Sequence, residues 1–97
     1  MAAAETRSYP ERLIGTLHHP VPETRQLAAE ILGELQYGPA IEPLLARARE
    51  VLQEHPPDTP FLATLLRSAR DCGAPAREWQ ALVAQANSRV LRKLAQE

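Results

Sequence analysis

The sequence offers almost nothing that could cross-link the chain or bind a metal ion through sulfur. Cys72 is the single cysteine among 97 residues, which excludes an internal disulfide and a cysteine-based zinc site. A secreted scaffold held together by disulfides is therefore not expected. No apolar run approaches the roughly 18–20 residues that a membrane-spanning helix requires, and the first residues lack the basic start and apolar stretch of a signal peptide. We therefore expect a cytoplasmic protein that does not insert into a membrane.

Aromatic side chains and net charge are scarce as well. Aromatic residues make up 4% of the chain, and the formal net charge is −1. Alanine and leucine are abundant, which favours helices and argues against a β-sandwich or a β-barrel. A chain of 97 residues provides one small domain. The composition thus predicts a single all-α domain spanning residues 1–97.

Proline and glycine divide the chain into five segments with helical periodicity. Ser8 and Glu11 have the spacing of a capping box at the start of the first segment. Asp58 or Thr59 can cap the fourth helix, and Gly38 suits the left-handed position after the second. The predicted helices cover about residues 9–18, 23–37, 40–54, 59–71 and 75–95.

The apolar residues of the second helix return at steps of three and four, and the same pattern recurs later in the chain. The first stripe comprises Leu27, Ala28, Ile31, Leu32 and Leu35. Its counterpart comprises Phe61, Leu62, Leu65, Leu66 and Ala69. A helix pair with one apolar face per helix cannot bury itself and must stack on a neighbour. We therefore predict a flexible start at 1–8, a leading helix at 9–19 and two helix pairs at 22–55 and 58–96.

Residues 20–54 carry a more specific pattern. An arginine near the start of the second helix is followed by Ala-Ala and then by Leu-Gly-x-Leu, and the next helix opens with Ala-Ile-x-Pro-Leu-Leu. The residues of this pattern are Arg25, Ala28, Ala29, Leu32, Gly33, Leu35, Ala40, Ile41, Pro43, Leu44 and Leu45. The segment resembles a HEAT repeat, of the short bacterial kind also found in phycobilisome lyases. The resemblance implies a short right-handed α-α superhelix of about five helices.

Candidate reactive groups are few, and each has a simple structural explanation. His18, His19 and Glu23 could suggest metal ligands, but adjacent histidines usually point apart and a site needs three or four converging ligands. Cys72 follows Asp71 at a helix end, where the negative end of the helix dipole disfavours a thiolate. The sequence contains no P-loop, dinucleotide-binding motif or ordered nucleophile–base set. It predicts a protein without a catalytic, cofactor or metal site.

Two further features bear on packing. Trp79 is open to two interpretations, since tryptophan is favoured at interface hot spots but lies here in the apolar stripe of the fifth helix, which favours the core. Gly33 and the pair Ala28–Ala29 reduce side-chain bulk, as a close approach of two helices requires. Tyr37, at a turn, is expected to be partly exposed.

The best-supported function from sequence is a non-catalytic protein-interaction or scaffold module, which binds another protein through the polar faces of the third and fifth helices. Its candidate contact residues are Arg47, Glu50, Gln53, Glu54, Gln80, Gln85, Arg89 and Arg92. Self-association is an open alternative, because charge asymmetry can steer the acidic end of one copy onto the basic end of another.

Two other classes of function compete with this interpretation. Residues 60–97 carry six basic residues against three acidic ones, which permits nucleic-acid binding through the C-terminal half. The contacts expected in that case are Arg67, Arg70, Arg77, Arg89, Arg92 and Lys93. A chromophore lyase-type subunit, the enzymatic class, is the least favoured, because no suitably placed nucleophile is evident.

Overall fold

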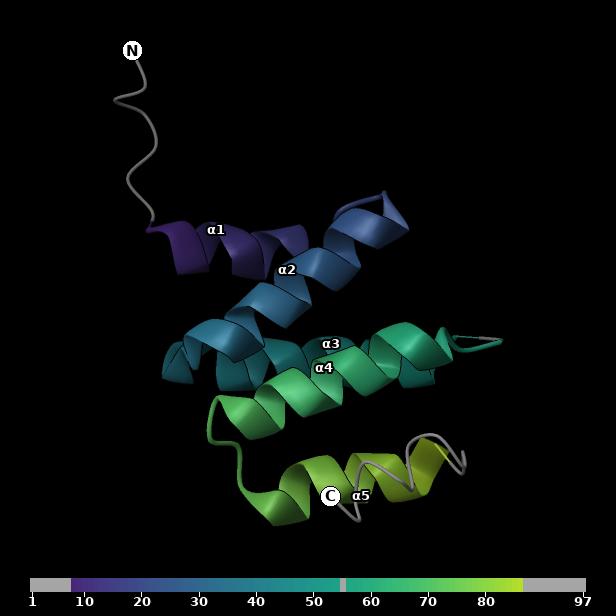
Figure 1. The fold of residues 1–97 in the computed structure, drawn as a ribbon. Coiled ribbons are helices and arrows are strands. Elements are labelled where there is room, and N and C mark those ends of the chain that lie inside the picture. Colours follow the sequence, from purple (N-terminus) through teal and green to yellow (C-terminus); the bar gives the residue numbers. More distant parts are fainter. Residues whose placement is uncertain (1–7, 55, 87–97) are drawn as a thin grey trace.

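The computed structural model describes residues 8–54 and 56–86, and these residues form helices joined by short turns (Figure 1). No strand occurs within these two ranges, which confirms the all-α prediction. The predicted flexible start, apart from Ser8, and the predicted continuation of the last helix beyond Ala86 lie outside the described residues. The elements are α1 (Tyr9–Thr16), α2 (Pro22–Leu35), the 3-10 turn η2 (Gly38–Ala40), α3 (Ile41–Leu52), α4 (Thr59–Asp71) and α5 (Ala76–Ala86).

Local capping signals account for where two of the helices begin. The Ser8 hydroxyl accepts a hydrogen bond from the Glu11 amide at 3.4 Å, and the Glu11 carboxylate accepts one from the Ser8 amide at 2.9 Å. This reciprocal pair confirms the capping box. The Asp58 carboxylate accepts from the Phe61 amide at 3.2 Å, so Asp58 is the cap of α4.

The end of α2 differs from the prediction. Gln36, not Gly38, adopts the left-handed conformation, with φ 53° and ψ 43°. The Gln36 amide donates to the Gly33 carbonyl at 3.1 Å and the Tyr37 amide to the Leu32 carbonyl, so the helix closes two residues earlier than expected. Gly38 is thereby free to begin η2.

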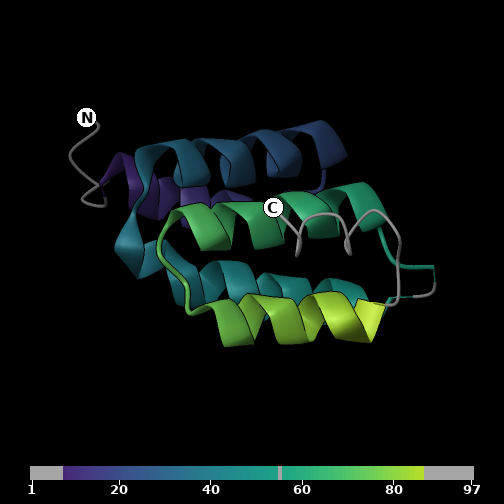
Figure 2. The ribbon, with the colours of Figure 1, turned by 60° about the horizontal axis from the view of Figure 1, so that its bottom comes forward.

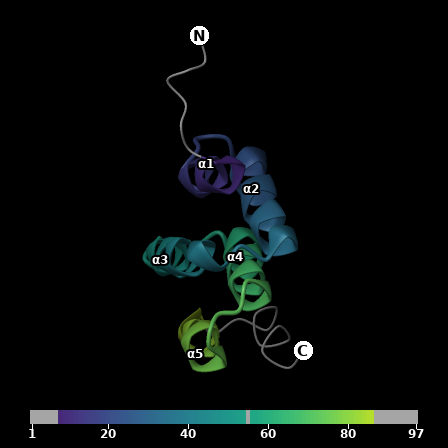
Figure 3. The ribbon, with the colours of Figure 1, turned by 90° about the vertical axis from the view of Figure 1, so that its left-hand side faces the viewer.

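The helices form two layers. One layer contains α2 and α4, and the other contains α1, α3 and α5 (Figure 3). α4 has the most extensive contacts, packing on α2 and α3 and less extensively on α5 (Figure 2). α1 packs against α2, and α3 packs mainly against α4. The grouping of residues 22–55 and 58–96 as two helix pairs stays a prediction.

The core runs between the two layers. Trp79 is 5% exposed and lies in this core, which decides between its two interpretations, and Tyr37 is partly buried against it. The largest fully buried side chains are Leu17, Leu32, Leu44, Leu45, Val51, Leu62, Leu65 and Leu66.

None of the described helices combines the length and apolarity needed to cross a membrane.

The apolar stripe of α2 is only half buried, contrary to the prediction. Leu32 and its small neighbours Ala28 and Ala29 are buried, but Leu27 is 56% exposed and Leu35 is 48% exposed. The helices α1 and α4 cover part of the circumference of α2. Leu27 and Leu35 lie outside that part, so the stripe is wider than the surface that its neighbours cover.

Candidate interaction surface

The rotation of α2 about its own axis is determined by a close contact with α4. The Ser68 hydroxyl of α4 donates a buried hydrogen bond to the Ala29 carbonyl of α2 at 2.7 Å. A Cβ atom at Gly33 would lie 2.8 Å from the Ser68 hydroxyl and 3.0 Å from its Cα. The absence of a side chain at Gly33 therefore permits this approach, as predicted. Because Ala29 and Gly33 face α4, the side of α2 that carries Leu27 faces solvent.

Three apolar side chains follow one another along this outward side of α2. Leu27, Ile31 and Leu35 are spaced by four residues, which places them on one ridge of the helix. Leu27 and Leu35 are exposed, whereas Ile31 is partly buried and packs against the core. We call these three residues the α2 apolar line. Single exposed leucines are ordinary, but apolar residues gathered in one place indicate an interaction site.

An acidic row borders the α2 apolar line. Glu23, Glu30 and Glu34 are exposed and stand four residues before, three after and seven after Leu27, so they lie beside it on the helix surface. Glu30 accepts a hydrogen bond from the Gln26 amide group at 3.3 Å. The outward side of α2 thus combines an apolar ridge with a row of negatively charged carboxylates.

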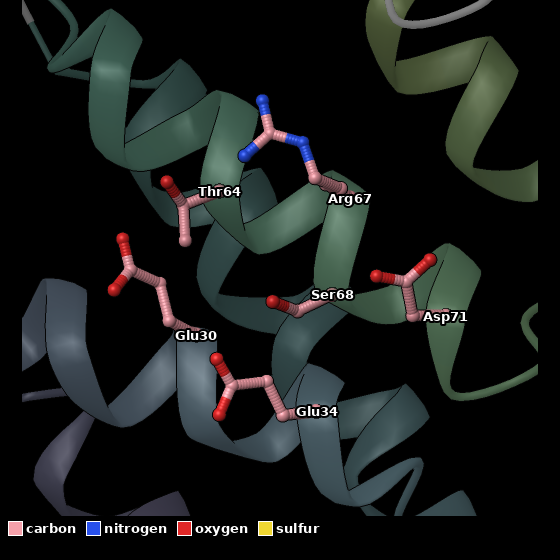
Figure 4. A pocket seen from close by; sticks show the side chains of 6 residues that line it. All are labelled: Glu30, Glu34, Thr64, Arg67, Ser68 and Asp71. Carbon is pink, nitrogen blue, oxygen red and sulfur yellow. The ribbon is translucent and has the colours of Figure 1, made fainter. Parts of the chain in front are cut away.

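An open groove of about 290 Å³ lies between α2 and α4. Figure 4 shows Glu30 and Glu34 on one side of it and Thr64 and Ser68 on the other. Three carboxylates and one guanidinium line this groove, which gives it a net negative charge; the carboxylates are Glu30, Glu34 and Asp71, and the guanidinium is that of Arg67. In the described ranges no group of three or more histidine, cysteine or acidic side chains is arranged to hold a metal ion.

Arg47, predicted as a partner contact, is engaged inside the molecule. Its side chain is 13% exposed, and its Nε donates to the Leu17 carbonyl at 3.0 Å. Its guanidinium lies 3.0 Å from the Glu50 carboxylate and 5.6 Å from the centre of the Phe61 ring. Arg47 therefore ties the end of α1 to α3 and α4.

Glu50, another predicted contact, belongs to the same cluster. His18 Nε2 lies 3.0 Å from its carboxylate. The hydrogen bond from His18 is the largest influence and lowers the pKa of Glu50; burial opposes it, and the hydrogen bond from Arg47 lowers the pKa further. The side chain stays half exposed, so this contact links the α1–α2 loop to α3 at the surface.

Arg25 takes part in the same region, although the sequence assigned it no role there. It donates to the His19 carbonyl at 2.9 Å and to the Pro20 carbonyl at 3.3 Å, and it lies 5.5 Å from the centre of the Phe61 ring. Arg25 and Arg47 thus both contact one aromatic ring. No spacing rule pointed to this cluster, because its members come from α2, α3, α4 and the loop after α1.

The remaining predicted partner contacts are dispersed over the surface. Gln53 and Glu54 are exposed at the end of α3, and Gln80 and Gln85 are exposed on α5. Glu54 is also 4.0 Å from the Arg47 guanidinium. Arg89 and Arg92 lie outside the described residues. The structure therefore brings Arg47, Glu50 and Glu54 together, and it leaves the two glutamines on a separate helix.

Two of the three described arginines of the nucleic-acid alternative, Arg67 and Arg70, lie near carboxylates. Arg67 lines the groove that contains Glu30, Glu34 and Asp71, and Arg70 Nε donates to the Asp71 carboxylate at 3.3 Å. Arg77 is exposed on α5. The other three members, Arg89, Arg92 and Lys93, lie outside the described residues.

Cys72 is a half-buried residue at the end of α4. Its thiol lies 3.3 Å from the Leu32 carbonyl, and burial raises its pKa. A raised pKa lowers the thiolate fraction at neutral pH. The contact therefore connects the end of α4 to α2.

Comparison with known proteins provides no relative for this chain: no family model, no curated protein and no solved structure matches it.

Proposed function

We propose that this chain is a non-catalytic protein-interaction module that binds its partner through the α2 apolar line. The observation that carries the proposal is the exposure of Leu27 and Leu35, 56% and 48%, on one ridge with Ile31. Burying such side chains against a partner releases water from apolar surface, which is the main favourable term in protein association. The acidic row along the ridge adds a preference for a partner of positive charge.

The architecture that supports this function is a short HEAT-like superhelix. Two features favour it: helices alternate between two layers, and α2 and α4 approach closely at Gly33. In such a stack each helix has two flanks, and the first helix of a layer has a neighbour on only one of them. The α2 apolar line then corresponds to the open flank at the start of the layer. The polar side chains of α3 and α5, including Gln53, Gln80 and Gln85, form a second candidate surface.

Copurification from the native source, followed by mass spectrometry, tests the proposal. Three tagged baits are compared: the natural chain, the double variant Leu27→Gln/Leu35→Gln, and the control Val21→Gln. Val21 is 43% exposed and lies at the N-cap of α2, outside the apolar line. Its variant therefore makes the same kind of change, an exposed apolar residue to glutamine, away from the proposed surface. We expect a protein captured by the natural chain and the control to be lost with the double variant. The same proteins captured by all three baits would contradict the proposal.

Nucleic-acid binding has weaker support because Arg67 and Arg70 have carboxylates beside them. Retention of the protein on DNA or RNA, measured at increasing salt concentration, distinguishes nucleic-acid binding from protein binding. If charge reversal at Arg89 and Arg92 leaves any such retention unchanged, the nucleic-acid alternative fails.

A further inference from the structure

The outward side of α2 defines the chemistry of its occupant. The three apolar residues of the line require an apolar surface, and the acidic row requires positive charge beside it. A second α2 does not meet these requirements. Two copies packed line against line would bring Glu23, Glu30 and Glu34 of each copy close to the same acidic row of the other, which like-charge repulsion disfavours.

The chain itself contains a segment with the required chemistry. In residues 89–94, written Arg-Val-Leu-Arg-Lys-Leu, three basic residues are interspersed with three apolar ones. The large apolar residues of α3 and α4 are already in the core. Arg25 and Arg47 are engaged around Phe61. Residues 87–97 therefore match the α2 apolar line in hydrophobicity, and their basic residues are opposite in charge to the acidic row beside the line.

The position of α5 favours docking between two copies over docking within one. α1 and α2 lie at one end of the molecule and α5 at the other (Figures 1 and 3), with α4 packed between α2 and α5. Eleven residues in a helix extend about 16 Å, at 1.5 Å per residue. Reaching the outward side of α2 from α5 requires passing α4, a path of about two interhelix distances of 8–10 Å each. If the last helix continues to about residue 95, as the sequence predicts, the tail is too short to follow that path and still lie along α2.

We propose that residues 87–97 of one copy dock on the α2 apolar line of a second copy. Val90, Leu91 and Leu94 contact the line, while Arg89, Arg92 and Lys93 lie beside the acidic row. Reciprocal exchange of the two tails closes a dimer with two-fold symmetry. This proposal rests on the proposed function, because it takes the α2 apolar line as the interaction surface and names its occupant.

Sedimentation velocity of the full chain over a range of concentrations tests the proposal. We expect a dimer of twice the 10.7 kDa chain mass. The variant Leu27→Gln/Leu35→Gln should raise the dimer dissociation constant by about tenfold or more, whereas the control Val21→Gln should leave it unchanged. Circular dichroism confirms that each variant retains its helices.

Mixing two variants distinguishes tail exchange from any other dimer. A line variant, Leu27→Gln/Leu35→Gln, keeps its tail, and a tail variant, Leu91→Gln/Leu94→Gln, keeps its line. At a concentration where each variant alone is monomeric, their mixture should recover a heterodimer through one intact tail and one intact line. As a second readout that leaves the apolar residues in place, Glu34→Lys and Lys93→Glu should each weaken the dimer, and both together in one chain should restore it.

The outcomes separate this inference from the proposed function. A monomer at all concentrations, a dimer insensitive to Leu27 and Leu35, or a mixture that stays monomeric overturns the docking of residues 87–97 between copies. If copurification still captures another protein through Leu27 and Leu35, the proposed function stands without it. If neither self-association nor capture depends on these leucines, both proposals fail.

Discussion

Replacing Gly33 with alanine tests the close contact between α2 and α4. The new Cβ would lie 2.8 Å from the Ser68 hydroxyl and 3.0 Å from both its Cα and its Cβ. Rotating the Ser68 side chain cannot relieve a contact with its Cα, so α2 and α4 must move apart. That movement would also stretch the buried hydrogen bond from Ser68 to the Ala29 carbonyl, now 2.7 Å long.

Three effects set the magnitude. Alanine is favoured over glycine inside a helix by about 1 kcal/mol. Overpacking costs about 1–3 kcal/mol, and a buried hydroxyl left without its partner costs about another 1–3 kcal/mol. We expect Gly33→Ala to lower the free energy of unfolding by about 2–4 kcal/mol. Without the close contact, the same change would stabilise the protein.

Urea denaturation followed by circular dichroism measures this change. Gly38→Ala is the matched control, because no heavy atom lies within 4 Å of a Cβ placed there. The control should be neutral or stabilising by up to about 1 kcal/mol. In a Ser68→Ala background the cost of Gly33→Ala should be smaller, since the nearest atom and the hydrogen bond are already removed. A Gly33→Ala protein as stable as the natural chain would refute the close approach of α2 and α4.

Three other changes test the core, the surface cluster and the thiol. Leu32→Ala should cost about 2–5 kcal/mol in urea denaturation and Glu34→Ala no more than about 0.5 kcal/mol; equal losses would refute the assigned orientation of α2. Because hydrogen bonds from His18 and Arg47 lower the pKa of Glu50 below 4.5, its stabilising contribution is complete above that value and is lost as pH falls through the lowered pKa. The urea midpoints of the natural chain and Glu50→Gln should therefore differ at neutral pH and converge as the pH falls through the lowered pKa of Glu50, and a constant difference would contradict the assignment. Because burial raises the pKa of Cys72, iodoacetamide should alkylate it more slowly in the folded chain than in urea, as followed by mass spectrometry; equal rates would contradict this.

The features that could be predicted from sequence are those determined within a few residues along the chain. The capping box at Ser8 and the cap at Asp58 depend on groups three residues apart, so spacing alone reveals them. The end of α2 was misplaced because Gln36 can adopt the left-handed conformation, although glycine is the usual residue there. Gly38 was the stronger signal but not the residue that closes the helix.

The candidate contact residues show where sequence reasoning stops. Helix phase places Arg47 and Glu50 on the polar side of α3, but polarity alone does not show whether a side chain is available to a partner. In the structure their partners come from other elements: the Leu17 carbonyl, the His18 ring and the Phe61 ring. A charged side chain with partners thirty residues away looks the same in the sequence as one that faces water.

The α2 apolar line illustrates the same limit from the apolar side. Periodicity measures the width of an apolar stripe, but burial depends on how many neighbours cover it. Phe61, Leu62 and Leu65 of α4 are buried because α4 has helices on several sides. The matching residues of α2 repeat the pattern, yet Leu27 and Leu35 are exposed because α2 begins its layer. Two helices with a similar apolar pattern therefore differ in burial according to their position in the layers, since the first helix of a layer exposes the surface that an internal helix buries against its neighbour.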